Sequence, residues 1–241
     1  MSLNGRLVLV TGAARRVGKA LALAAASAGA DIVLHYGGSH AEAEETRSEI
    51  QALGRQAHLL QADLEDPAQA GDLIRRAGEF GPLYALVNSA SIFEPVNWET
   101  TSLAEWNRHL AVNLTAPFLL SQAFSKALDP EQTGRIVNIL DWRALRPGRD
   151  HLPYTISKAG LAALTQSLAI TLAPRITVNG LALGAVLPPA DGSDTGRLIA
   201  SVPAGRWARL EEVGQALLFL LEGPAYVTGE IIHVDGGRHL V

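Results

Sequence analysis

Two kinds of segment alternate along this chain, and their alternation restricts the possible folds more than any other feature of the sequence. Short apolar runs rich in β-branched residues are expected to be strands; they are residues 6–12, 31–36, 57–63, 83–90, 135–140, 176–183 and 230–237. Between them lie longer stretches with helical periodicity, at residues 15–29, 40–54, 67–80, 102–128, 154–174 and 209–223. Strands that alternate with helices form a parallel sheet, and strands that are apolar throughout are buried on both faces. We therefore predict an α/β protein: a doubly wound, seven-stranded parallel sheet with helices on both faces.

The composition fits a single domain spanning residues 1–241. The chain has a mass of 25.5 kDa, is 48% hydrophobic and 18% charged, and contains no repeat or linker-like stretch. Its least regular region, residues 187–207, is rich in Pro and Gly and follows the sixth predicted strand, so we expect it to be a lid over a ligand.

Several classes of function are disfavoured by the same composition. A net charge of −4 gives no basic surface for nucleic acid or an anionic membrane. The absence of cysteine excludes thiolate metal sites, and the seven histidines show no H-x-x-x-H spacing, so we predict no metal. The amino terminus does not resemble a signal peptide, and no run of about 18 apolar residues would span a membrane. We therefore expect a cytoplasmic protein.

A glycine-containing loop, "TGAARRVG", follows the first predicted strand and opens the first helix. In this context glycine lets the backbone approach a pyrophosphate, and the helix amino terminus supplies amide donors. The middle glycine of the usual G-x-G-x-x-G is here Arg16, and an ordinary strand-to-helix turn is the alternative explanation. The residues that we expect to contact a dinucleotide in this loop are Gly12, Arg15, Arg16, Val17 and Gly18.

The end of the second predicted strand favours NADP(H) over NAD(H). Enzymes selective for NAD place a carboxylate there to bind the ribose diol, but no acid occurs between Ile32 and His40. Arg16, His35, Tyr36 and Ser39 are instead expected to surround a 2′-phosphate, with a solvated basic loop as the alternative.

The third predicted strand ends at Asp63, followed by Leu64. In the dinucleotide interpretation both residues lie beside the adenine, and Asp63 accepts a hydrogen bond from its amino group. The same aspartate can equally cap the next helix, because "DLEDP" is typical of a helix start.

The motif Tyr154-x-x-x-Lys158 places a phenol and an ammonium on one face of a predicted helix. A phenol has a pKa near 10, and a nearby positive charge lowers it toward the range that is useful for proton transfer. Asn113 lies on an otherwise apolar helix face, where it is either a kink and water relay to Lys158 or an ordinary surface residue.

These motifs, in the order "TGAARRVG", "VNSAS", "AVN", Tyr154-x-x-x-Lys158 and "VDGG", resemble those of the short-chain dehydrogenase/reductase family over essentially the whole chain. The resemblance implies a Rossmann fold with strand order 3-2-1-4-5-6-7, a nicotinamide cofactor and a homotetramer. It implies that Tyr154 is the proton donor, that Lys158 binds the ribose and that Asn113 is a relay. The further cofactor contacts that it implies are Asn88, Ser89, Ala90 and Gly184.

Asp141 departs from what a ketone reductase requires. A serine at this position would donate a hydrogen bond to a carbonyl oxygen as it gains charge, whereas an ionised carboxylate only accepts and repels that oxygen. A C=N substrate needs a proton at nitrogen after hydride reaches carbon, and Asp141 with Tyr154 can relay it. Asp141 therefore favours reduction of C=N, and its charge would keep Tyr154 protonated.

Further details resemble the pteridine and dihydromonapterin reductases of that family: "TGAARR", "LHYGGS", "VNSASIF", Asp141 and the terminal "DGGRHL". This resemblance implies that Phe93 stacks on a pterin, that Ser91 contacts cofactor or pterin, and that Arg16 contacts phosphate and substrate. Phe93 as a simple loop anchor is the alternative, and Trp142 either lines the pocket or packs.

Three functions remain open on the sequence. The first is an NADPH-dependent reductase of a pterin-like heterocycle. The second is a carbonyl reductase of the same family acting on an acyl thioester, a sugar or another ketone. The third is a nucleotide-binding subunit without activity.

Overall fold

The computed structural model describes residues 2–187 and 196–241, and its seven strands form one sheet. The strands pair in the order β3-β2-β1-β4-β5-β6-β7, and every pair is parallel. The predicted strand order is thus confirmed. The bounds of the strands are β1 Leu7–Val10, β2 Asp31–Tyr36, β3 Ala57–Gln61, β4 Leu83–Asn88, β5 Gly134–Asp141, β6 Ile176–Leu183 and β7 Ile231–Val234.

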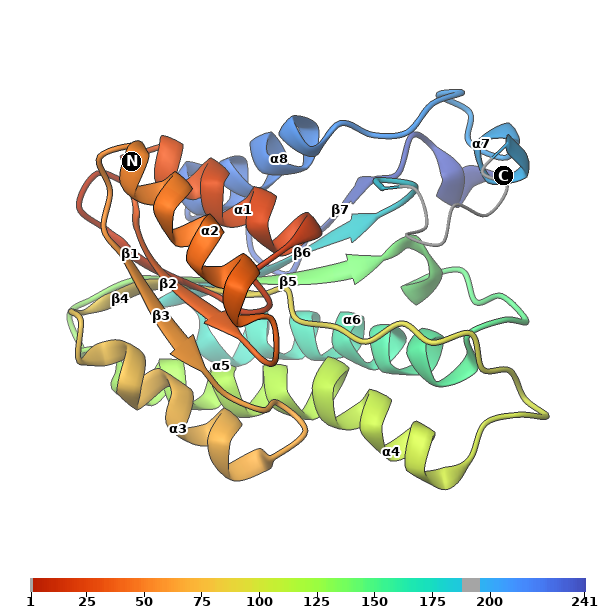
Figure 1. Cartoon of the computed structure of the whole chain (residues 1–241), viewed down its shortest axis with the longest axis horizontal. Coiled ribbons are helices and arrows are strands. Elements are labelled where there is room, and N and C mark those ends of the chain that lie inside the picture. Colours follow the sequence, from red (N-terminus) through yellow and green to blue (C-terminus); the bar gives the residue numbers. More distant parts are fainter. Residues whose placement is uncertain (1, 188–195) are drawn as a thin grey trace.

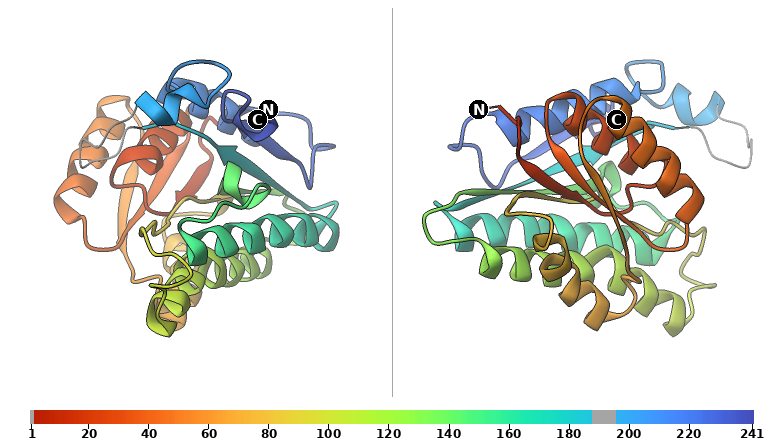
Figure 2. Two further views of the ribbon diagram at one scale, coloured as in Figure 1. Left: turned by 90° about the vertical axis from the view of Figure 1, so that its right-hand side faces the viewer. Right: turned by 60° about the vertical axis from the view of Figure 1, so that its left-hand side comes forward.

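Helices cover both faces of the sheet, as Figure 1 shows and the two views of Figure 2 repeat. One layer holds α1 (Arg16–Ser27), α2 (His40–Ala52) and α8 (Leu210–Glu222). The other holds α3 (Pro67–Gly78), α4 (Leu103–Leu110), α5 (Ala116–Ala127) and α6 (Leu152–Leu172). Separate apolar cores lie against the two faces of the central strands. Burial on both faces explains why these strands are apolar throughout.

The single helix predicted for residues 102–128 is interrupted. Between α4 and α5 the chain forms a π-helical turn, Ala111–Thr115. Pro117 has no N–H to donate to the carbonyl of Asn113 four residues earlier, and its ring obstructs a regular turn there. Such π-helical turns are frequent at functional sites, and this one carries Asn113.

The region predicted to be a lid is described in part. Residues 188–195 lie outside the described residues, while α7 (Gly196–Ala200) was not predicted as a helix. Its role as a lid stays a prediction.

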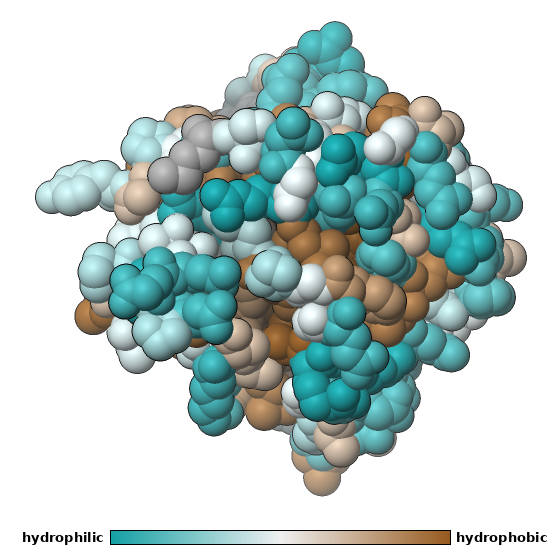
Figure 3. Space-filling model, turned by 90° about the vertical axis from the view of Figure 1, so that its left-hand side faces the viewer, coloured by the Kyte–Doolittle hydropathy of each residue, from teal (hydrophilic) through white to brown (hydrophobic). Residues whose placement is uncertain are grey.

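Among the described residues, no helix combines the length and the apolar character that crossing a membrane requires. On the face drawn in Figure 3, which lies away from the tips of the β5 and β6 arrows, hydrophobic surface gathers between hydrophilic areas above and below.

Candidate active site

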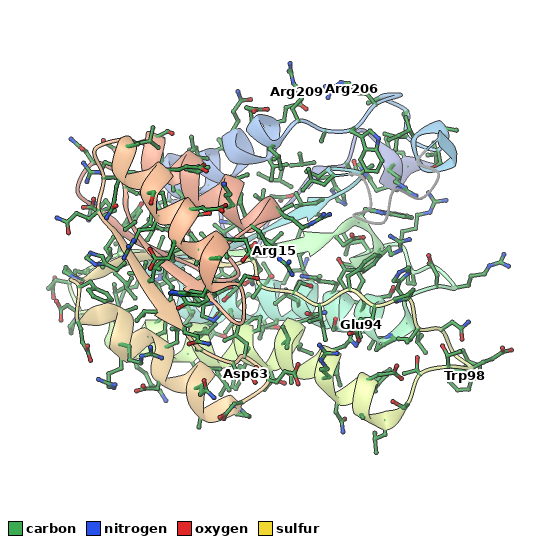
Figure 4. All side chains as sticks on the ribbon, in the orientation of Figure 1. Arg15, Asp63, Glu94, Trp98, Arg206 and Arg209 are labelled. Carbon is green, nitrogen blue, oxygen red and sulfur yellow. The ribbon has the colours of Figure 1, made fainter. Side chains whose placement is uncertain are left out.

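The predicted site residues gather where the parallel strands end. Figure 4 labels Arg15, Asp63 and Glu94, which follow β1, β3 and β4, on the side toward which the strands point. Asp141 is the last residue of β5, and α6 brings Tyr154 and Lys158 beneath it. The carboxyl ends of strands in an open parallel sheet are where such folds bind ligands.

The glycine loop is packed too closely to hold any side chain at its two glycines. Gly12 has φ +64°, and a Cβ on it would stand 2.8 Å from Cα of Ala90. A Cβ on Gly18 would stand 2.1 Å from the carbonyl oxygen of Gly12. Arg16 has φ +54°, which residues other than glycine rarely adopt. The loop therefore forms a tight turn that leaves backbone beside the start of α1, as a dinucleotide cradle requires.

Thr11 ties this loop to the end of β4, a role that the sequence did not suggest. Its Oγ1 accepts hydrogen bonds from the amides of Ser89 (2.9 Å) and Ala90 (3.0 Å). Its own amide donates to the carbonyl of Val87. The predicted cofactor residues Ser89 and Ala90 are thus held against Gly12.

The structure contradicts the expectation that His35 contacts a 2′-phosphate. Its side chain is 2% exposed, Nδ1 accepts from the amide of Gly12 (3.2 Å), and Nε2 donates to the carbonyl of Ala62 (3.1 Å). Burial lowers the pKa of His35 to about 4, so the imidazole is neutral. His35 instead holds the glycine loop against β2 and β3. Histidine is a residue type that can bind phosphate, which is why the sequence suggested this contact. Successive side chains of a strand point to opposite faces, however, and that of His35 points into the interior.

The groups that surround the end of β2 differ from those predicted. Tyr36 is buried, and its hydroxyl lies 2.8 Å from Nδ1 of His40. Arg15 and Arg16 are exposed, and in the described part of the chain neither guanidinium pairs with a carboxylate. His40 is exposed at the first position of α2, beside Ser39. His40 therefore joins Arg16 and Ser39 as a candidate phosphate contact, although the sequence analysis did not select it.

Two roles were considered for Asp63, a contact with an adenine and the cap of the next helix. The start of α3 tests the second. Asp66 is the cap of this helix, since its Oδ1 accepts from the amide of Ala68 at 2.8 Å. Asp63 is exposed, and its Oδ1 accepts from the amide of Glu65 at 2.9 Å. Leu64 is buried in the core. Asp63 is therefore not the helix cap, and its contact with an adenine stays a prediction.

Three more predicted cofactor residues have packing roles within the protein. Asn88 is buried, and its amide group donates to Oδ1 of Asn138 at 2.8 Å. Gly184, at the end of β6, has no room for a side chain, because a Cβ would stand 2.6 Å from Cα of Asp235. Val17 is half-buried and packs against the core beside α1. Each position has a packing reason for its residue type, and their contacts with a cofactor stay predictions.

Asp141, Tyr154 and Lys158 form one hydrogen-bonded group. The phenol of Tyr154 donates to Oδ2 of Asp141 at 3.2 Å, and the amide of Arg143 donates to Oδ1 at 2.8 Å. The ammonium of Lys158 donates to the carbonyl of Ile139 at 2.7 Å and lies 5.8 Å from the centre of the Tyr154 ring. All three side chains are at least half-buried.

The electrostatics of this group keep the proton on the phenol. Burial, and then the charge of Asp141, raise the pKa of Tyr154 well above its ordinary value. Burial also raises the pKa of Asp141, and it lowers the pKa of Lys158 to about 8, which the charge of Asp141 partly opposes. Tyr154 therefore keeps its proton at neutral pH, hydrogen-bonded to the carboxyl group of Asp141.

Asn113 braces the loop after β4. It is fully buried in the π-helical turn, and its Oδ1 accepts from the amide of Ile92 (2.9 Å) and the hydroxyl of Ser91 (3.1 Å). Its Nδ2 donates to the carbonyl of Ile92 (3.1 Å) and to Oγ of Ser157 in α6 (3.0 Å). The predicted kink is present, the alternative of a surface residue is wrong, and no direct bond joins Asn113 to Lys158. A relay through water stays a prediction.

Phe93 presents an aromatic ring beside Tyr154. It is 52% exposed, and its edge-to-face contact with Tyr154 has ring centres 4.7 Å apart at 78°. The imidazole of His151 stacks on it with centres 4.0 Å apart at 4°. The sequence did not identify His151. This residue precedes α6 with a left-handed backbone conformation, and its Nδ1 lies 3.2 Å from Oδ2 of Asp150. A flat heterocycle is thus a shape that the exposed ring of Phe93 is suited to contact.

Within residues 2–187 and 196–241, His, Asp and Glu side chains nowhere gather in the groups of three that could hold an ion.

Known proteins resemble this chain over its whole length. A protein-family model described as enoyl-(acyl carrier protein) reductase matches residues 12–239. The chain belongs to the short-chain dehydrogenase/reductase family. Among the curated members of this family, a 3-oxoacyl-[acyl-carrier-protein] reductase from Synechocystis sp. is 33% identical, with 98% of each chain covered.

Solved structures of the short-chain dehydrogenase/reductase family agree closely with this fold. The FolM alternative dihydrofolate reductase 1 from Brucella canis, complexed with NADP, is 38% identical and superposes with a TM-score of 0.92 over 100% of this chain and 97% of that one. A short-chain dehydrogenase from Burkholderia cenocepacia, in complex with NADP, is 34% identical with a TM-score of 0.93, and 99% of each chain is covered. The names of the Synechocystis and Brucella canis relatives give different substrates, a 3-oxoacyl-[acyl-carrier-protein] and dihydrofolate.

Proposed function

We propose that this short-chain dehydrogenase/reductase is an NADPH-dependent enzyme that reduces a C=N bond of a dihydropterin or dihydrofolate. The observation that carries the proposal is the 3.2 Å hydrogen bond from Tyr154 to Asp141. A carboxyl group lies where a carbonyl reductase would need a hydrogen-bond donor, and it contacts the acid that must protonate the product.

The chain offers a fitting site for NADP(H). Gly12 and Gly18 allow a tight turn in which backbone, without side chains at these two positions, lies beside the start of α1, and solved neighbours were complexed with NADP. Arg16, Ser39 and His40 would hold the 2′-phosphate, and Lys158 would bind the ribose next to the nicotinamide. When bound, NADPH supplies the hydride.

The protein's own part in the reaction is to deliver a proton to nitrogen. Tyr154 holds that proton at neutral pH because burial and Asp141 raise its pKa. As Tyr154 gives the proton to the substrate nitrogen, the positive charge of Lys158 stabilises the phenolate. Asp141 then returns a proton to Tyr154 from solvent, a step favoured by the raised pKa of its own carboxyl group.

Phe93 would position the substrate by stacking. Its half-exposed ring lies beside Tyr154, so a pterin stacked on it would bring a ring nitrogen toward the phenol. Offset stacking of aromatic rings is worth about 0.5–1.5 kcal/mol beyond the area buried. Ser91, held by Asn113, would contact the same ligand at its rim.

One observation favours a second function. The curated relatives named 3-oxoacyl-[acyl-carrier-protein] reductase are 32–34% identical. In a ketone reductase Asp141 would have to be protonated to donate to the carbonyl oxygen, and its raised pKa moves it in that direction. We favour the pterin because a ketone reductase needs a hydrogen-bond donor at this position. A neutral hydroxyl group would donate without first being protonated, whereas the buried carboxyl group would not.

The variant Asp141→Ser separates the two functions. The proposal predicts that it lowers the kcat for dihydrobiopterin at least about 100-fold, a typical contribution of proton transfer, while the Kd for NADPH changes less than about twofold. A control variant, Asp129→Ser, removes an acid elsewhere on the surface and should change neither constant. An Asp141→Ser enzyme with its pterin rate intact would contradict the role given to the carboxylate.

The predicted homotetramer and cytoplasmic location stay predictions.

A further inference from the structure

A cleft is lined by Trp142, the residue that follows Asp141 in the chain. It has a volume of about 770 Å³, within the usual range for ligand sites. We call it the arginine cleft and define it by Trp142, Arg146, Pro147, Val202, Pro203 and Arg238, six of the residues that line it. Figure 1 shows the carboxyl terminus of the chain near α7, at the side toward which the β5 and β6 arrows point.

Two guanidinium groups in this cleft have no acidic partner among the described residues. Arg146 donates to the backbone carbonyl of Arg238 at 3.3 Å, and the guanidinium of Arg238 lies 4.4 Å from the centre of the Trp142 ring. By contrast, Arg143 next to the cleft is paired with Asp150 at 3.1 Å. The arrangement therefore brings two guanidinium groups to a concave surface, and within the described residues neither forms a direct ion pair with a carboxylate.

The environment of Arg238 supports this assignment of excess charge. Burial, and then the charge of Arg143, lower the pKa of Arg238, with Asp141, Asp150 and Asp235 opposing. Two cations held near each other and partly buried are stabilised by an anion placed between them and solvent. An anionic group is thus the ligand that this surface would bind best.

Arg143 links the wall of the cleft to the proposed active site, because its guanidinium carbon lies 5.1 Å from the centre of the Trp142 ring and 5.9 Å from that of the Phe93 ring. Asp141 accepts the proton donor's hydrogen bond, Trp142 forms the wall, and the amide of Arg143 holds Asp141. A ligand whose reactive ring lies against Phe93 can therefore extend past Trp142. Trp142, Pro147, Val202 and Pro203 give the cleft apolar walls before the arginines are reached.

We propose that the arginine cleft binds the acidic tail of an extended pterin substrate. The tail that fits has an apolar or aromatic spacer followed by carboxylates, as in dihydrofolate and its polyglutamates, whereas pterins with short polyol side chains would leave the cleft empty. Charge-assisted bonds from arginine to carboxylate are the strongest hydrogen bonds of this kind. This inference rests on the proposed function and narrows its substrate class.

The test compares substrates that share the reactive ring and differ in the tail. Steady-state constants are measured for 7,8-dihydrobiopterin, dihydrofolate and dihydrofolate triglutamate with wild-type enzyme and with Arg146→Gln and Arg238→Gln. Arg149→Gln is the matched control, because it removes an exposed arginine of the same loop that does not line the cleft. Arg238→Lys keeps the charge, and the Tm of each variant verifies that it folds.

The inference predicts that each glutamine variant raises the KM for dihydrofolate about 5- to 10-fold and for the triglutamate by more. The kcat values and the KM for dihydrobiopterin stay within twofold, and Arg149→Gln and Arg238→Lys resemble the wild type. The effect also shrinks as salt is raised. If wild-type enzyme reduces pterins and the glutamine variants leave the KM for dihydrofolate unchanged, the cleft does not bind the tail and the proposed function still stands. If wild-type enzyme reduces no pterin, the proposed function is wrong and this inference fails with it.

Discussion

The phenol of Tyr154 donates its hydrogen bond to Asp141, 3.2 Å away, while Lys158 donates to the backbone at Ile139. The phenol is therefore engaged by a carboxyl group, and the ammonium of Lys158 lies 5.8 Å from the centre of its ring. This arrangement couples three titrating groups, so the state of one changes the pKa of the others.

This coupling predicts how the pH profile responds to Asp141→Asn. Burial lowers the pKa of Lys158 to about 8, and the charge of Asp141 opposes that change. Lys158 is positive below its pKa, so kcat/KM should fall as pH rises through about 8. Asparagine removes the opposing charge, which lowers the pKa of Lys158 further and moves the falling limb to lower pH. Profiles of kcat/KM between pH 5 and pH 10 (roughly the range over which these groups titrate) measure this. A limb that stays in place or moves upward would refute the coupling.

Phe93→Ala should weaken substrate binding and leave cofactor binding intact. The ring is half-exposed beside Tyr154, and the loss of one stacked face is expected to raise the pterin KM roughly 5- to 20-fold, from about 1–2 kcal/mol of stacking and burial. Phe93→Tyr keeps the ring and should resemble the wild type. Phe118→Ala removes another exposed phenylalanine, on α5, and serves as the control. Equal pterin constants in Phe93→Ala and wild type would assign Phe93 to loop packing.

Asn113→Ala should lower stability because its amide makes four hydrogen bonds in a fully buried position. The backbone N–H and carbonyl of Ile92 would lose their partner, at a cost of about 2–4 kcal/mol in the free energy of unfolding. Urea denaturation measures this difference. Asn107→Ala, an exposed change on α4, should cost less than about 0.5 kcal/mol. Similar losses of unfolding free energy in the two variants would show that the hydrogen bonds of Asn113 contribute little to stability.

The strands and the shared helix face of Tyr154 and Lys158 were predictable from short-range sequence patterns, whereas the order of the sheet was implied by the family resemblance. Apolar runs with β-branched residues identify strands buried on both faces, and the four-residue spacing of Tyr154 and Lys158 fixes a shared helix face. The observed order and the grouping of Tyr154 with Asp141 follow from these patterns and from the family resemblance.

Other features depend on contacts that no local pattern contains. His35 looked like a phosphate ligand until strand alternation and tertiary contacts with Gly12 and Ala62 placed it inside. His151 contacts Phe93 across 58 residues of sequence, and the arginine cleft joins segments nearly 100 residues apart. The π-helical turn had a local signal in Pro117, which the long apolar periodicity of residues 102–128 outweighed.

The neutral, buried His35 predicts acid-sensitive stability. Burial lowers its pKa from 6.5 to about 4, so the unfolded chain binds a proton between these values and the folded chain does not. The contribution of His35 is fully present above about pH 6.5 and is lost as pH falls toward 4, roughly 3 kcal/mol in all. Urea unfolding at several pH values should give a shallower pH dependence for His35→Gln than for wild type, with the exposed His40→Gln as control. Identical pH dependences for wild type and His35→Gln would contradict this assignment.

The most direct test of the account is the choice of substrate by the purified wild-type enzyme. NADPH oxidation is followed at 340 nm (about the wavelength at which the reduced nicotinamide absorbs) with dihydrobiopterin, dihydrofolate and an acetoacetyl thioester. The account predicts turnover of at least one pterin with a kcat/KM at least about 100-fold above that for the thioester, because Asp141 favours protonation of nitrogen over stabilisation of an alkoxide. Efficient reduction of the thioester with no turnover of any pterin would contradict it.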